Sequence, residues 1–192
     1  MDNQQELSGP SSTELAWLSG LLNADGCFSL TFRKREAKLK CDMSITLTQC
    51  DPCVIERAQS ILGKMGINPG ISEYAPGSNG LRTKWNARIS KMSHMSQLVA
   101  AVEPFMVGEK QAQARLMKAY IDRRIKYADP SMRKWSGGEI EKDLLSLAIA
   151  AEFHAVRRLD VPRELAQVLN DYPAREYAQA RGSARDALGV KI

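Results

Sequence analysis

The spacing of hydrophobic and polar positions changes several times along this chain, and each change predicts a new element. Residues 12–24 are apolar on nearly every side, which is typical of a helix that is buried on most of its surface. From residue 28 the period becomes two, with apolar residues alternating with polar ones over 28–33 and again over 38–48. This alternation predicts a long β-hairpin with one apolar face and one polar, basic face.

The remaining pattern predicts a second helix, a second hairpin and two further helices. Asp51-Pro52 begins a helix that ends at Gly66, because proline is well suited to a first helical turn. A shorter hairpin is expected over 70–74 and 81–90 with a turn at 76–80, followed by helices over 93–102 and 109–127. The fold class is therefore α+β, with a four-stranded antiparallel sheet.

The first helix carries two different stripes. Ala16, Gly20 and Ala24 recur every four residues, and bulky leucines lie on another side. The small residues allow a second helix to approach closely, and Asp25 follows them directly at the helix end. An ordinary helix end, with Gly26 as its cap and Asp25 in solvent, is the alternative. Ser12 or Thr13 is expected to cap the start of this helix.

Positive charge is concentrated in the first two-thirds of the 192 residues. The net charge is +5, with 17 Lys and Arg against 12 Asp and Glu in residues 1–128 and ten of each kind in 129–192. Clusters over 33–40 and 82–91 contain nine cations and one acid. Such a distribution favours a polyanionic partner, although a basic surface without any partner is the simpler alternative.

Composition also excludes several classes. The apolar runs are too short to span a bilayer, and the polar, acidic N-terminus is not expected to be a signal peptide. The four cysteines are too few for a disulfide framework, and the single Cys50–Cys53 CxxC has no second pair to complete a zinc site. We expect reduced thiols in an intracellular protein, with no membrane partner and no small-molecule substrate.

The run Leu18–Gly26, LSGLLNADG, resembles the motif of the LAGLIDADG homing endonucleases at six of nine positions. The first acid of that motif is Asn23 here, whereas the second is kept as Asp25. The resemblance implies the αββαββα fold, double-stranded DNA as substrate, and Mg²⁺ or another divalent cation such as Mn²⁺. A chain with one motif is implied to act as a homodimer through Ala16, Gly20 and Ala24.

The resemblance also assigns catalytic residues. Asp25 is implied to bind the metal, assisted by the backbone carbonyl of Ala24. Gln49 stands where the family often has a glutamine that holds water. Gly108 stands where the family has a catalytic lysine, so Lys110 is the nearest cation that can stabilise phosphate charge.

The polar faces of the two hairpins are the expected DNA-binding surface. A two-stranded ribbon fits the major groove, long cations suit phosphate or guanine, and asparagine suits adenine. A face that is simply solvated is the alternative. The candidate residues are Ser29, Thr31, Arg33, Arg35, Lys38, Lys40, Asp42, Ser44, Thr46, Ser72, Lys84, Asn86 and Arg88.

These observations predict an intron-encoded endonuclease that makes a staggered double-strand break in a long, nearly palindromic site. A non-cleaving protein on the same scaffold, an intron maturase or a DNA-binding regulator, is the rival. We expect a disordered lead-in over 1–11, the endonuclease core over 12–128 and a helical extension over 129–192. The extension has expected helices over 139–156, 162–169 and 173–180, and its role stays open.

Overall fold

The computed structural model describes residues 9–36, 38–75, 82–126 and 143–188. Several predicted features lie outside these residues: most of the lead-in, the turn at 76–80, and the start of the extension with the first residues of the helix expected at 139.

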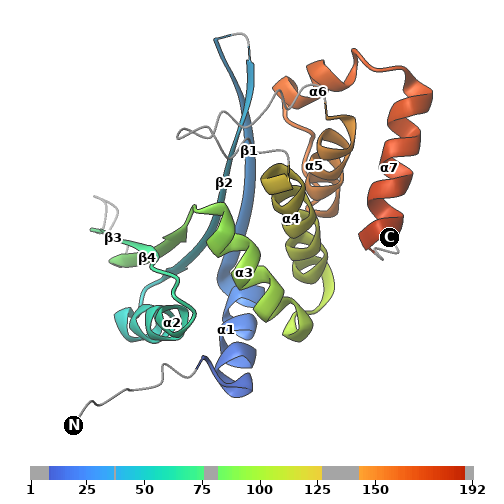
Figure 1. The fold of residues 1–192 in the computed structure, drawn as a ribbon. Coiled ribbons are helices and arrows are strands. Elements are labelled where there is room, and N and C mark those ends of the chain that lie inside the picture. The colour runs from blue at the N-terminus through green and yellow to red at the C-terminus, as the bar shows by residue number, and fades with distance from the viewer. Residues whose placement is uncertain (1–8, 37, 76–81, 127–142, 189–192) are drawn as a thin grey trace. The chain divides into compact units, whose positions relative to one another are not determined.

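Seven α-helices, one 3₁₀ helix and four strands are present in the described part of the chain (Figure 1). The four strands form one sheet in the order β1-β2-β4-β3, and the predicted α+β class with a four-stranded antiparallel sheet is confirmed. In chain order the elements are α1 (Ser12–Asp25), β1 (Gly26–Arg35), β2 (Lys38–Gln49), α2 (Pro52–Lys64), β3 (Gly70–Tyr74), β4 (Lys84–Ile89), α3 (Met92–Val102), η1 (Glu103–Phe105), α4 (Gly108–Lys126), α5 (Leu144–Val156), α6 (Arg163–Leu169) and α7 (Ala174–Leu188).

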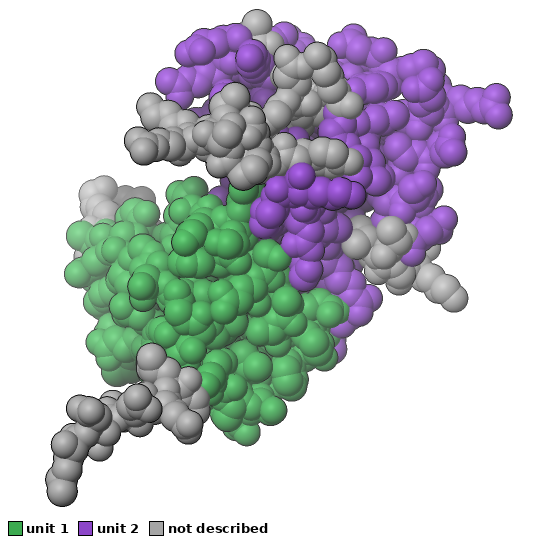
Figure 2. Space-filling view, in the orientation of Figure 1, with its two compact units in different colours: residues 1–27, 44–106 green, residues 28–43, 107–192 purple. Residues whose placement is uncertain are grey.

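The chain divides into two compact units, shown in different colours in Figure 2. Unit 1 contains residues 1–27 and 44–106, and unit 2 contains residues 28–43 and 107–192. The two long strands β1 and β2 each contribute residues to both units.

In unit 1, helix α1 lies against α2, α3 and η1. Leu18 and Leu22 are buried, and the buried Ser19 hydroxyl donates to the carbonyl of Val102 over 3.1 Å. The helix is capped by Ser11 rather than by Ser12 or Thr13, because Ser11 and Glu14 accept from each other's backbone N–H and form a capping box.

Helix α1 passes into strand β1 without a loop, and Gly26 makes this junction possible. Its φ of −71° is open to any residue, so the left-handed cap that glycine often provides is absent. Glycine is required at position 26 because there is no room for a side chain: a Cβ there would lie 2.4 Å from the carbonyl oxygen of Leu22. Glycine therefore allows the strand to leave the helix directly after Asp25.

In unit 2, the apolar face of the first hairpin packs on α4 and α5. The Phe32 ring lies 6.3 Å from Tyr120 and 6.4 Å from His154 between ring centroids, and Arg157 donates to the carbonyl of Phe28 over 3.1 Å. The C-terminal extension thus supplies one of the two helices that support the hairpin. Burial lowers the pKa of His154, which keeps this imidazole neutral among aromatic rings.

Helix α7 continues well past Ala180, where the sequence predicted its end. Glu152 of α5 is only 1% exposed and accepts hydrogen bonds from Arg181 over 2.5 Å and from Arg185 over 2.8 Å. Because a buried carboxylate needs partners, these arginines hold α7 in helical register through Gly182. The predicted helix over 173–180 was therefore too short, because the carboxylate that its continuation binds comes from a distant segment.

We expect Gly26→Ala to lower the free energy of unfolding by about 1–3 kcal/mol, since the added methyl group collides with the Leu22 backbone. Gly63→Ala is the matched control on α2, where a Cβ meets nothing within 4 Å. There alanine should stabilise the helix by up to about 1 kcal/mol. Urea unfolding of both variants checks the pair, and equal stabilities would contradict the close approach.

Candidate functional site

Asp25 and Gln49 are brought together although they lie far apart in the sequence. Asp25 is the last residue of α1 and is exposed, and Gln49 is the last residue of β2. The Gln49 Nε2 donates a hydrogen bond to the Asp25 Oδ2 over 2.7 Å. Two of the three residues predicted to be catalytic therefore form one hydrogen-bonded pair within unit 1.

The surroundings of Asp25 favour a positively charged ligand. The C-terminal end of a helix carries partial negative charge, and the last turn of α1 contains no basic residue to compensate it. An ionised carboxylate has about four lone-pair positions, of which Gln49 occupies one. The carboxylate thus retains capacity for a further ligand on its exposed side.

The small-residue stripe of α1 is open. Ala16, Gly20 and Ala24 are all exposed, and a Cβ built at Gly20 meets nothing within 4 Å. Asn23 is half-buried. The stripe therefore has room for another surface, and its role as a dimer interface stays a prediction.

Lys110 belongs to unit 2, in the first turns of α4, where it is half-buried. Its catalytic assignment stays a prediction. Gly108, the first residue of this helix, has a φ of +63°, in the left-handed region that favours glycine. A lysine in this backbone conformation would be strained.

Within unit 1 the polar face of the sheet consists of cross-strand rows. Asn86 of β4 pairs with Thr48 of β2 on one side and with Ser72 of β3 on the other. Arg88 pairs with Thr46 and Gly70 in the next row, and Lys84 pairs with Tyr74. Ser72, Lys84 and Arg88 are exposed, and Thr46 and Asn86 are half-buried.

Ser44 is the exception among the predicted face residues, because it is 7% exposed and is counted with the buried residues. It follows Met43 and precedes Ile45, both also buried, so the alternation of exposure fails at this point of β2. The sequence alternation identified its side of the strand but could not show that this part of β2 is covered.

The polar face of the hairpin in unit 2 is largely exposed. Arg33 and Asp42 form an ion pair of 2.5 Å across the strands, so the single acid of this face neutralises one of its cations. Ser29 and Thr31 hydrogen-bond each other over 3.2 Å. The remaining cations of the predicted face, Arg35, Lys38 and Lys40, are exposed.

A hollow of about 530 Å³ opens beside β3 and β4 in unit 1. Asn86 and Arg88 line it, together with residues that sequence reasoning missed, namely Tyr74, Lys91 and His94. Tyr74 has the same strand parity as Ser72, so extending that face by two residues would have found it. Thr48 already lay within the predicted alternation, on the same face as Thr46, but was not among the candidates.

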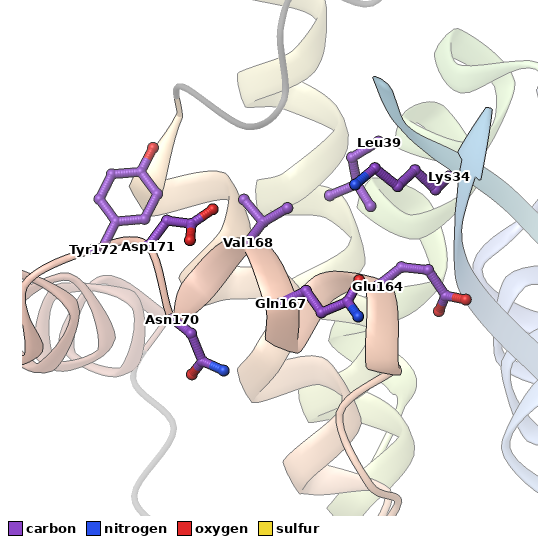
Figure 3. Close-up of a pocket in the computed structure, with 8 residues that line it drawn as sticks. All are labelled: Lys34, Leu39, Glu164, Gln167, Val168, Asn170, Asp171 and Tyr172. Carbon is purple, nitrogen blue, oxygen red and sulfur yellow. The ribbon is translucent and has the colours of Figure 1, made fainter. Parts of the chain in front are cut away.

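A second hollow, of about 700 Å³, lies in unit 2 between the hairpin and α6 (Figure 3). Lys34 and Leu39 approach it from the hairpin, and Glu164, Gln167 and Asp171 from α6 and the turn that follows. Lys34 and Leu39 have the parity of the apolar face. Helix α6 and the turn that follows it therefore lie beside the hairpin, on the side opposite the predicted DNA-binding face.

The cysteines are free thiols in the described part of the chain. The N–H of Cys53 donates to Asp51 at the start of α2, and burial raises the pKa of Cys41 to about 12. Within the described ranges no three His, Cys, Asp or Glu side chains gather as a metal site, and no helix is long and apolar enough to cross a membrane.

Comparison with known proteins agrees with this geometry. The family model of the LAGLIDADG-like domain matches residues 12–100. No curated protein sequence matches the chain.

Solved structures share the fold. The homing endonuclease I-CvuI, solved in complex with the I-CreI target in the presence of Mg, is 17% identical with a TM-score of 0.57, covering 94% of this chain and 97% of that one. The archaeal intron-encoded homing endonuclease I-Vdi141I, complexed with DNA, is 16% identical with a TM-score of 0.60, covering 82% of this chain and 93% of that one.

A third similar structure is the homing endonuclease I-SmaMI bound to cleaved DNA, with 14% identity and a TM-score of 0.58, covering 87% of this chain and 51% of that one. The matched region contains the motif helix, the Asp25–Gln49 pair and all four strands. Over residues 12–100, therefore, the chain contains a LAGLIDADG-like domain.

Proposed function

We propose that this protein is a homodimeric, site-specific DNA endonuclease that makes a staggered double-strand break in a long, nearly palindromic target and is encoded within an intron. The observation that carries the proposal is the exposed Asp25 carboxylate, held by Gln49 at the end of the motif helix. The similar structures support it, since I-CvuI and I-Vdi141I were solved with DNA.

A divalent cation fits the residues at this site. Mg²⁺ is usually bound by one or two carboxylates, waters and substrate phosphates rather than by an all-protein cage. Asp25 with the neighbouring Ala24 carbonyl would hold it, and the exposed carboxylate at a negative helix end suits that role. A bound cation would polarise the phosphate and lower the pKa of the attacking water.

The residues of the chain then have separate tasks. Gln49 fixes one oxygen of Asp25 by its hydrogen bond and so orients the carboxylate. Lys110 is the candidate for stabilising phosphate charge, and the exposed cations of the sheet would hold the DNA backbone.

We expect a dimer because one chain carries only one of the two catalytic carboxylates that double-strand cleavage needs. Each chain supplies one Asp25, whereas cutting both strands requires an active carboxylate for each. Two-fold symmetry brings two copies of one surface together, and the exposed Ala16–Gly20–Ala24 stripe ends beside Asp25.

The second candidate function is a non-cleaving protein on the same scaffold, an intron maturase or a DNA-binding regulator. Asn23 favours it, because the family motif has an acid at that position, and so does the glycine at 108. Cleavage distinguishes the two functions.

Asp25→Asn should reduce the rate of DNA cleavage at least about a hundredfold, because it removes the charge that holds the cation. The dissociation constant for DNA should stay unchanged, since the sheet contacts remain. The assay uses a target selected from a random DNA library, with Mg²⁺ and with a chelator. Asp160→Asn, at an exposed loop position, is the control. Near-normal cleavage by Asp25→Asn would show that the site assignment is wrong.

Gly20→Leu should weaken dimerisation at least about tenfold and abolish double-strand cleavage, because the new side chain occupies the contact between the two helices. Within one chain the position is open, so the fold should tolerate leucine. Gly63→Leu, on another open helix surface, is the matched control. Analytical ultracentrifugation measures both. A monomeric wild-type protein that still cuts both strands would rule out the symmetric mechanism.

Lys84→Ala and Arg88→Ala should each flatten the salt dependence of DNA binding. Each lost phosphate contact lowers the slope of log K against log salt by about one. Lys64→Ala is the control, because this lysine lies on α2 and pairs with Glu14. Binding titrations at several salt concentrations give the slopes. Unchanged slopes and affinities in both variants would remove β4 from the binding face.

A further inference from the structure

The side chain of Asn86 is held between two neighbouring strands. Thr48 of β2 lies opposite it on one side, and its hydroxyl donates to the Asn86 Oδ1 over 3.3 Å. On the other side, Asn86 and Ser72 hydrogen-bond the hydroxyl of Tyr74 from β3, and both bonds lower the pKa of that phenol. All four side chains belong to unit 1.

These bonds use half of the hydrogen-bonding capacity of the amide. An asparagine has two acceptor positions on Oδ1 and two donor hydrogens on Nδ2. Thr48 takes one acceptor position on Oδ1. A hydrogen bond with the Asn86 side chain lowers the pKa of Tyr74, as a bond in which the amide is the donor would. One acceptor and one donor remain.

The side chain of Asn86 borders open space. Asn86 lines the hollow of about 530 Å³, beside the exposed cation Arg88. An adjacent acceptor and donor complement the N6 amino group and N7 of adenine in the major groove. Guanine, the other purine, presents two acceptors at these positions, so the pattern of one donor and one acceptor distinguishes adenine from guanine.

We infer that Asn86 reads an adenine in each half of the DNA target, and that Thr48 and Tyr74 are positioning residues that fix the orientation of its amide. This inference rests on the proposed DNA-binding function. It goes further in naming one base and the residues that select it.

The strand geometry also places the contact relative to its neighbours. Side chains on one face of a strand are about 6.7 Å apart, which is close to two base-pair steps of about 3.4 Å. Lys84 and Arg88 flank Asn86 on the same face of β4. Where β4 follows the groove, the selected adenine therefore lies about two base pairs from each position that these cations contact.

The test is selection of binding sites from a random DNA library by the full chain, followed by affinities for all four bases at each position. The wild-type protein should prefer adenine at one position of each half-site by about 5- to 150-fold. Asn86→Ala should remove that preference at this position alone. Because a ratio of affinities is measured, the fraction of correctly folded protein cancels.

Thr48 provides a matched pair of variants. Thr48→Val keeps the shape but removes the donor, so it should reduce the adenine preference by about 2- to 10-fold. Thr48→Ser keeps the hydroxyl and should retain the preference. A Thr48→Val protein that prefers adenine as strongly as Thr48→Ser would overturn the positioning role.

The two levels of the proposal fail differently. If the wild-type protein enriches no DNA sequence, the proposed function is wrong and the inference falls with it. If it enriches a defined site whose base preferences are the same in the wild type and in Asn86→Ala, DNA binding stands and the assignment of Asn86 is wrong.

Discussion

The direct passage from helix α1 into strand β1 is the constraint on which the candidate site depends. Gly26 permits it, because a side chain there would collide with the carbonyl of Leu22. The junction leaves Asp25 exposed at the negative end of the helix and within hydrogen-bonding distance of Gln49, at the end of the neighbouring strand β2. A loop at this point would free the carboxylate from both the helix end and its glutamine partner.

The two faces of the sheet have different surroundings, because alternate residues of each strand point to opposite faces. In the first hairpin, Phe28 and Phe32 are buried, and Phe32 lies against the rings of Tyr120 and His154. The opposite face carries exposed cations. Because successive side chains point to opposite faces, a strand can be rigidly packed on one side and remain available for a ligand on the other. The C-terminal helices contribute to the packed side.

Polar side chains on the open face are themselves ordered. Asn86 is bonded by Thr48 and Tyr74, and Arg33 pairs with Asp42. Such bonds reduce the side-chain entropy that binding would otherwise cost. They also reduce the positive charge of this face, because Asp42 partly neutralises Arg33. A count of cations therefore overstates the charge available for binding phosphate.

The sequence by itself determined the element order, the two faces of the hairpins and the motif helix, since period and turn residues are local properties of the chain. Its resemblance to the family also pointed to Asp25 and Gln49. Tertiary structure alone decided that these two residues bond to each other and that Ser44 is buried. It also decided that Thr48 and Tyr74 hydrogen-bond Asn86. Finally, it decided that α7 continues past Gly182, where its arginines bind Glu152. Each of these depends on residues brought together from distant segments, and burial and pairing across such distances leave no periodic trace in the sequence.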